Sequence, residues 1–246
     1  MNWNDGTVLF FSVKSYTKNM VKRIIITGGS SGLGLELSKI YLQEWYEVIC
    51  LSRKKPDINV THVSLDYTKE ASISEAAIEI ESKYPDFDIL IHCTGIGYIE
   101  TFGDMNYPHS TEMMEVNLLW PTLLSSKLLP VVKKNKADIL YVWATIGYKP
   151  NEYMPLYSIT KWWFRGLVEN MRNELKNTPC RVMSISPPWM DTESNIGPNG
   201  RAKQIAEMTQ KPLWWMAKSS EIAQMIFQSL QTPKSIEMTE IVVNRK

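Results

Sequence analysis

Cysteine is scarce in this chain, and long apolar runs and an excess of charge of either sign are missing. The three cysteines, Cys50, Cys93 and Cys180, are odd in number and far apart. They indicate neither a disulfide framework nor a metal site, and we expect reduced thiols in a cytoplasmic protein. No segment reaches the roughly 18 apolar residues of a membrane helix. The formal net charge of +1 gives no electrostatic signature for nucleic acid or an anionic membrane.

The amino-terminal residues 1–19 read as an extension ahead of the first strand. Their short apolar patch, residues 8–11, lacks the basic leader and the small-residue cleavage site of a signal peptide. Met20 directly precedes a strand-like run, so we expect either that Met20 is the natural start or that the extension is loosely held. Residues 20–246 show no repeat, linker or low-complexity tract, which predicts a single domain.

Short apolar runs alternate along the chain with longer amphipathic segments. Runs that are apolar throughout are typical of strands buried on both faces of a parallel sheet. The regular alternation predicts an α/β fold, a Rossmann-type doubly wound parallel sheet of about seven strands with helices on both faces. The predicted strands are residues 23–27, 47–51, 59–64, 89–93, 139–143, 181–185 and 237–243. The predicted helices are residues 32–44, 69–84, 109–134, 152–177 and 218–231, and segment 193–217 is expected to be a mobile lid.

A glycine-rich turn follows the first predicted strand and opens the first predicted helix. Gly28 permits a tight turn, Gly32 lets the backbone approach a pyrophosphate, and Gly34 lets helix and strand pack closely. The free N–H groups and the positive end of the helix dipole attract phosphates. The turn therefore predicts a dinucleotide site formed by Gly28, Ser30, Ser31, Gly32, Leu33 and Gly34.

Tyr157 and Lys161 stand four residues apart in a segment predicted to be helical. At this spacing both side chains project from one face of a helix. A cation held beside a phenol favours the phenolate, and such a tyrosine can pass a proton to or from a substrate oxygen. The spacing also fits an ordinary solvated helix face, so the pair gains its meaning from the glycine turn upstream.

The glycine turn and the Tyr157–Lys161 pair together resemble the short-chain dehydrogenase/reductase family. The resemblance extends from the region of Met20 to the carboxyl terminus, and further matches occur in the family's order. These matches are Cys93-Thr94-Gly95 after the fourth strand, Asn117, and the segment from Pro187 to Thr192.

The resemblance implies a role for each matching residue. Tyr157 would be the general acid of carbonyl reduction or the base of alcohol oxidation, and Lys161 would assist it and hold the nicotinamide ribose. Asn117 would hold a water that relays protons from Lys161, and Thr192 would contact the nicotinamide carboxamide. The implied partners are a small carbonyl or alcohol substrate and further copies of the chain, as a homodimer or homotetramer, with no nucleic acid and no membrane.

The end of the second predicted strand favours NADP(H) over NAD(H). An Asp or Glu there would bind the ribose 2′-hydroxyl of NAD, but this chain has Ser52 and Arg53. Serine donates a hydrogen bond and arginine pairs with a phosphate in forked geometry, although the same residues also fit a basic surface loop. Asp66 and Tyr67 match the family's position beside adenine.

The serine that the family places 13 residues before the tyrosine is replaced by Ala144, and Thr145 is a candidate substitute. Losing one hydroxyl donor to the substrate oxygen costs on the order of 3 kcal/mol, or about a hundredfold in rate. The sequence thus predicts an NADP(H)-dependent oxidoreductase that interconverts a carbonyl and an alcohol. The alternative is a dinucleotide-binding regulator or scaffold with weakened chemistry, and a sugar-nucleotide epimerase is disfavoured by the short carboxyl-terminal part.

Several of the nine tryptophans stand where relatives commonly have glycine. One hypothesis is that some are glycines in the native protein, from a lineage that reads UGA as glycine. The alternative is that bulky side chains occupy tight places and destabilise the fold. The positions are Trp45, Trp120, Trp163 and Trp189, with Trp143 and one of Trp214 and Trp215 as further candidates.

Overall fold

Seven parallel strands form the central sheet in the described part of the chain. The computed structural model describes residues 21–210, 212 and 216–244, so the predicted extension 1–19, Trp214 and Trp215 lie outside it. The sheet order is β3-β2-β1-β4-β5-β6-β7, and every neighbouring pair is parallel. The strands are β1 (Arg23–Thr27), β2 (Glu47–Ser52), β3 (Thr61–Ser64), β4 (Ile89–His92), β5 (Asp138–Val142), β6 (Val182–Ser186) and β7 (Glu240–Val242).

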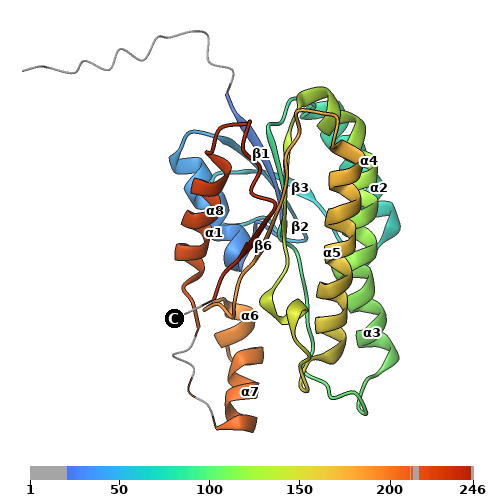
Figure 1. Cartoon of the computed structure of the whole chain (residues 1–246), viewed down its shortest axis with the longest axis vertical. Helices are drawn as coiled ribbons and strands as arrows, with labels where there is room; N and C mark the ends of the chain where they lie inside the picture. Colours follow the sequence, from blue (N-terminus) through green and yellow to red (C-terminus); the bar gives the residue numbers. More distant parts are fainter. Residues whose placement is uncertain (1–20, 211, 213–215, 245–246) are drawn as a thin grey trace, which may run out of the picture.

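Helices cover both faces of the sheet (Figure 1). On one face lie α1 (Gly32–Gln43) and α8 (Ser219–Leu230), and on the other lie α2 (Glu70–Lys83), α4 (Trp120–Asn135) and α5 (Pro155–Leu175). Successive side chains of a strand alternate between the faces, and β1 follows this rule. Ile24 and Ile26 join the buried cluster under α1 and α8, whereas Ile25 joins the cluster under α2, α4 and α5. The predicted doubly wound α/β fold is confirmed.

The helix predicted over residues 109–134 is interrupted, so the prediction of one continuous α-helix was wrong. It consists of α3 (Tyr107–Met114), a π-helical turn η1 (Glu115–Leu119) and α4. Pro121 has no N–H to donate to the carbonyl of Asn117, four residues earlier, so the α-helical ladder fails at that point. Single π turns of this kind occur frequently at functional sites.

Short helical pieces follow β5 and β6 at the end of the molecule where the strands finish (Figure 1). A 3-10 turn, η2 (Thr145–Tyr148), follows β5, and α6 (Glu193–Ile196) and α7 (Arg201–Thr209) follow β6. Segment 193–217 is thus partly helical over its described residues, while its mobility stays a prediction. Across the described residues, every helix is too short or too polar to cross a bilayer.

Trp45 adopts a backbone conformation that favours glycine. Its φ is 64°, at the position that directly follows the cap of α1. The N–H of Trp45 donates to the Leu42 carbonyl and that of Tyr46 to the Tyr41 carbonyl, at 3.2 and 3.0 Å, which is the Schellman pattern that usually ends on glycine. The indole is 89% exposed, so no packing offsets the backbone cost. The glycine hypothesis therefore has a structural reason at this position.

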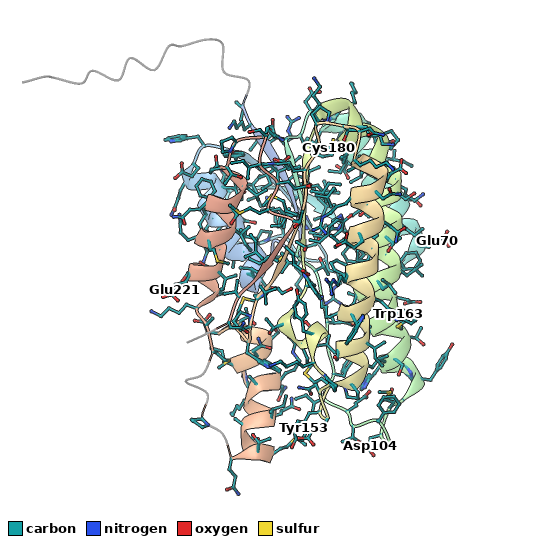
Figure 2. All side chains as sticks on the ribbon, viewed as in Figure 1. Glu70, Asp104, Tyr153, Trp163, Cys180 and Glu221 are labelled. Carbon is teal, nitrogen blue, oxygen red and sulfur yellow. The ribbon has the colours of Figure 1, made fainter. Side chains whose placement is uncertain are left out.

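Among the described residues, the other tryptophans have no positive φ. Trp163 is exposed on α5 (Figure 2), and Trp120 and Trp143 are buried in the core. The indole N–H groups of these two buried residues have no hydrogen-bond partner among the described residues. For these positions the glycine hypothesis stays a prediction.

Replacing Trp45 with glycine is expected to raise the free energy of unfolding by about 1 kcal/mol, because a left-handed conformation costs other residues roughly that much. Trp45→Ala separates the two contributions, since it removes the indole but keeps the backbone cost. Urea denaturation of the three proteins measures the effect. Equal stability of Trp45→Gly and Trp45→Ala would show that the backbone of residue 45 is not strained.

Candidate active site

A cavity of about 1160 Å³ opens at the carboxyl ends of the strands. Its floor lies where β1 and β4 adjoin and their connections leave toward opposite faces of the sheet, the place where doubly wound folds bind ligands. All the residues predicted to bind a cofactor line this cavity, as does Thr145, although they come from segments far apart in the chain. They are Gly28, Ser30, Ser31, Gly32, Leu33, Gly34, Ser52, Arg53, Asp66, Tyr67, Cys93, Thr94, Gly95, Tyr157, Lys161, Pro187 and Thr192.

The glycine turn has the geometry that its sequence predicts. Gly28 and Gly32 have φ values of +70° and +50°, which other residues adopt only at a cost. A side chain at residue 34 would place its Cβ 2.3 Å from the Gly28 carbonyl oxygen. The helix α1 can therefore begin directly above β1, with its free N–H groups at the cavity.

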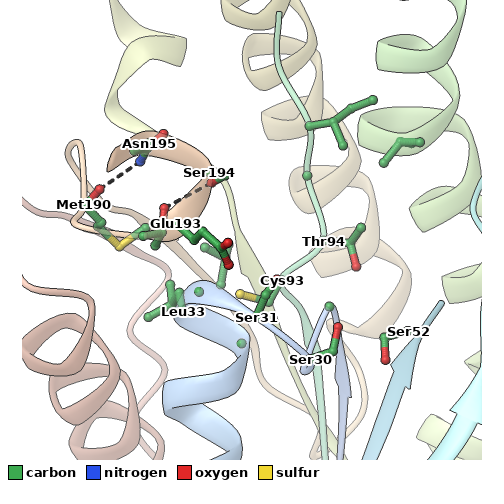
Figure 3. A pocket seen from close by; sticks show the side chains of 18 of the residues that line it. Ser30, Ser31, Leu33, Ser52, Cys93, Thr94, Met190, Glu193, Ser194 and Asn195 are labelled. Atoms are coloured by element: carbon green, nitrogen blue, oxygen red, sulfur yellow. Dashed lines mark hydrogen bonds between the residues drawn. The ribbon is translucent and has the colours of Figure 1, made fainter. Parts of the chain in front are cut away.

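The segment after β6 closes over this turn. Figure 3 shows Ser30, Ser31 and Leu33 at the start of α1, with the Met190–Asn195 segment beside them. The Thr192 hydroxyl lies 3.1 Å from that of Ser194, and the Asn195 amide donates to the Met190 carbonyl at 2.9 Å. The Thr192 methyl group lies 3.2 Å from where a Cβ of residue 32 would be. Thr192 is thus held against the glycine turn.

The end of β2 presents a basic edge to the cavity, formed by Arg53, Lys54 and Lys55. The buried Ser52 hydroxyl donates to the Lys54 carbonyl at 2.7 Å, so its proton is already in use. Partial burial opposes ionisation of Asp66, but hydrogen bonds from Thr68 and the nearby charges of Lys69 and Arg53 lower its pKa overall. The carboxylate of Asp66 is therefore ionised beside the basic edge.

Tyr157 and Lys161 project from α5 into the same part of the cavity. The Lys161 ammonium lies 5.5 Å from the centre of the Tyr157 ring and 5.3 Å from that of Phe164. Lys161 is 2% exposed, and no carboxylate lies within 4 Å of it in the described part of the chain. The predicted pair is thus brought together, with its cation buried.

Asn117 does not line the cavity but stands directly behind its wall. Its Oδ1 accepts from the Ile96 N–H at 2.8 Å, and its amide donates to the Ile96 carbonyl and the Thr160 hydroxyl. A Cβ on Gly95 would lie 3.5 Å from that Oδ1 and 3.1 Å from the Lys161 ammonium. Asn117 therefore fixes the loop after β4 beside Lys161.

Two other titratable groups near the site stay neutral around pH 7. Burial raises the pKa of the Cys93 thiol to about 12 against the opposing charge of Lys161. Burial lowers the pKa of His92 to about 3, and its ring stacks on Tyr141 and bonds the Ser125 hydroxyl at 3.0 Å. These contacts give His92 a structural role.

The sequence reasoning missed other residues that line the cavity. Glu112, Met154 and Arg201 belong to α3, to the residue before α5 and to α7. The sequence of segment 193–217 predicts a lid over the site, but nothing in it distinguishes Arg201 from its neighbours. Ala144 and Trp189 also line the cavity.

Comparison with known proteins assigns the family. The family model described as short chain dehydrogenase matches residues 22–200. The chain belongs to the short-chain dehydrogenase family. It is accordingly an oxidoreductase that acts on CH–OH groups, and the resemblance found in the sequence is confirmed.

Relatives of this short-chain dehydrogenase include proteins of bacteria, a yeast, a mosquito and rodents. The uncharacterized oxidoreductase YvrD of Bacillus subtilis is 32% identical over 183 residues, 69% of this chain and 70% of the relative. An uncharacterized oxidoreductase of Schizosaccharomyces pombe is 27% identical over 184 residues, 72% of this chain but only 63% of the relative. The closed form of a serine dehydrogenase complexed with NADP+ has the same fold, with a TM-score of 0.79, 19% identity, and 90% and 94% of the two chains covered.

Proposed function

We propose that this protein is an NADP(H)-dependent oxidoreductase that interconverts a carbonyl and an alcohol by hydride transfer, with Tyr157 as the general acid or base. The observation that carries the proposal is the meeting of the glycine turn and the Tyr157–Lys161 pair in one cavity. The turn supplies a phosphate site, and the pair supplies a proton-transfer group within reach of the same ligand.

The residues of the cavity fit a dinucleotide. The positive φ values at Gly28 and Gly32 and the start of α1 form a cradle for a pyrophosphate. When bound, the nicotinamide would supply the hydride. Lys161 would hold its ribose, and Thr192, fixed against the glycine turn, would hold its carboxamide.

Tyr157 would donate its hydroxyl proton to the oxygen of a carbonyl substrate. The buried Lys161 ammonium would stabilise the phenolate that remains. Asn117 would hold a water that returns the proton through Lys161. This role is supported by the position of its Oδ1, since Asn117 Oδ1 and the Lys161 ammonium both lie within 3.5 Å of where a Cβ of Gly95 would be.

The preference for NADP(H) rests on the basic edge at the end of β2. Arg53, Lys54 and Lys55 line the cavity there, and no carboxylate lies within 4 Å of Arg53 among the described residues. A 2′-phosphate would pair with the Arg53 fork. Structures of the same fold include complexes with NADP+ and with NADH, so the proposed choice of NADP(H) depends on the basic edge.

The alternative, a dinucleotide-binding regulator with weakened chemistry, is favoured by one observation. Ala144 presents only a methyl group to the cavity, so the substrate oxygen would lack the hydroxyl that relatives supply. Thr145 also lines the cavity and is the candidate replacement.

The predicted homodimer or homotetramer stays a proposal. Trp162 and Trp163 leave 58% and 52% of their surface exposed on α5, which forms a small apolar patch beside the exposed charged residues Arg165 and Glu169.

Replacing Tyr157 with phenylalanine is expected to lower kcat by about a hundredfold or more, because the proton donor is lost. NADPH affinity should stay close to that of the original protein, since the ring and Lys161 remain. Turnover of NADPH with a broad carbonyl panel and NADPH titration measure the two quantities. If the original protein consumes no NADPH with any carbonyl compound, the enzyme hypothesis fails and the regulator hypothesis is favoured.

Thr145→Val should lower kcat by about a hundredfold if the Thr145 hydroxyl replaces the missing serine. Thr145→Ser keeps a hydroxyl and should retain most of the rate, while Ala144→Ser should restore the rate to the valine variant. Steady-state kinetics of the variants provides the measurement. An unchanged kcat in Thr145→Val would mean that Tyr157 polarises the carbonyl without this hydroxyl.

Arg53→Ala should weaken NADPH binding by about tenfold and leave NADH binding nearly unchanged, because only NADPH carries the 2′-phosphate. Lys127→Ala, which removes an exposed cation on α4, is the matched control. Calorimetric titration of both cofactors measures the difference. Equal losses for the two cofactors would refute the assignment of Arg53.

A further inference from the structure

A second cation besides Lys161 stands at Tyr157. Arg201 is the first residue of α7, and its guanidinium carbon lies 5.7 Å from the centre of the Tyr157 ring. The neighbouring Ala202 is fully buried and anchors the start of the helix. Arg201 therefore reaches into the cavity from a fixed backbone position.

The loop after β4 leaves room for this arrangement. A Cβ at Gly97 would lie 2.7 Å from Nη1 of Arg201, 2.8 Å from the methyl carbon of Met154 and 3.0 Å from Cδ2 of Tyr157. The side chains of Arg201, Met154 and Tyr157 thus meet at the space that a side chain of residue 97 would fill. The guanidinium thus shares one compartment with the Tyr157 ring.

Arg201 differs from most of the other arginines because it has no carboxylate partner among the described residues. Of the six arginines in the described part of the chain, four lie within 4.0 Å of a carboxylate: Arg23, Arg165, Arg172 and Arg181. The two without such a partner in that part, Arg53 and Arg201, both line the cavity. Arg53 has a use in the proposed function as the partner of a cofactor phosphate, and Arg201 has none.

The hydrogen bonds of Arg201 leave part of its fork open. Nε and Nη2 donate to the backbone and side-chain oxygens of Ser194 at 3.4 and 3.2 Å, and no described residue accepts from Nη1. The nearby acid Glu112 accepts a hydrogen bond from the Tyr98 hydroxyl. The Glu193 carboxylate also borders the cavity, and it forms no ion pair with Arg201.

We propose that Arg201 binds a carboxylate of the substrate, which makes the substrate a short oxo acid or the corresponding hydroxy acid. The inference rests on the proposed function and names its substrate class. In the reduction, the carbonyl carbon gains the hydride, the carbonyl oxygen gains the Tyr157 proton, and the carboxylate stays unchanged on Arg201. Because the guanidinium lies over the ring that bears the reacting hydroxyl, few carbon atoms separate carboxylate from carbonyl.

The test compares an acid with its neutral ester in NADPH-dependent reduction. Acetoacetate and methyl acetoacetate are one pair, and 2-oxobutanoate and its methyl ester are another, with 2-butanone as a neutral ketone. The original protein should prefer one of the acids over its ester by about tenfold to a hundredfold in kcat/KM, as expected for a charge-assisted pair. Arg201→Gln should bring this ratio close to one, mainly through KM, and Arg201→Lys should keep part of it. Arg165→Gln is the matched control on α5 and should leave the ratio as it is.

The outcomes distinguish failure of the inference from failure of the proposed function. If esters or 2-butanone are reduced as well as the acids, the substrate class is wrong and the oxidoreductase stands. A loss of NADPH affinity in Arg201→Gln, with the acid-to-ester ratio kept, would assign Arg201 to the cofactor and overturn the inference. If no carbonyl compound is reduced, the proposed function fails. Tryptophan fluorescence of the NADPH-loaded protein would then be measured, since Trp143 and Trp189 line the cavity. Quenching by acetoacetate or 2-oxobutanoate that is abolished in Arg201→Gln would support a carboxylate site at Arg201. The absence of quenching would refute the carboxylate site too.

Discussion

The contact between the start of α1 and the turn after β1 decides where the rest of the cavity lies. With a Cβ at Gly34 the helix would collide with the Gly28 carbonyl at 2.3 Å, so only a glycine allows it to begin this close to the sheet. Two other segments lean on the same turn. Thr94, after β4, lies 3.0 Å from the Cβ position of Gly28, and Thr192, after β6, lies 3.2 Å from that of Gly32. Segments that follow three strands are thus placed by one turn.

The buried cations show how the chain separates stability from chemistry. Arg181 is buried with Asp138 at 2.7 Å. It also donates to the Leu230 carbonyl at the end of α8 and to three carbonyls in the segment that follows α8, so its charge is compensated and connects β5 to that segment. Lys161 is equally buried. Its ammonium lies near the aromatic rings of Tyr157 and Phe164, and no carboxylate of the described residues lies within 4 Å of it. An uncompensated buried cation is costly, and this cost is understandable where a phenolate or a ligand oxygen completes the site.

Much of the fold could be predicted because its signals are local. A continuous apolar run such as residues 24–26 indicates a strand buried on both faces, and the glycine turn and the Tyr157–Lys161 spacing each fit within a few residues. The break in the 109–134 helix needed one further step, since Pro121 removes a hydrogen bond to the Asn117 carbonyl. The final position of Asn117 depends on Ile96 and Thr160, which no local pattern relates to it.

The substrate end of the cavity was far less predictable than the cofactor end. Arg201 reaches Tyr157 only because α7 folds back after β6 and Gly97 leaves space between them. Neither condition leaves a periodic or compositional trace in segment 193–217. The position of Trp45 shows the opposite case, since a helix end followed by a strand predicts a glycine there and the backbone has kept the glycine conformation.

Transfer of deuterium from NADPH labelled at C4 of the nicotinamide to a carbonyl substrate tests the central claim most directly. The product would be isolated after reaction in ordinary water and examined by mass spectrometry and NMR. If the glycine turn and Tyr157 serve one hydride transfer, one face of the labelled cofactor will deliver deuterium to the carbinol carbon, while the new hydroxyl proton comes from solvent. A product without deuterium from cofactor labelled on either face, or no product from any carbonyl compound, would contradict the account.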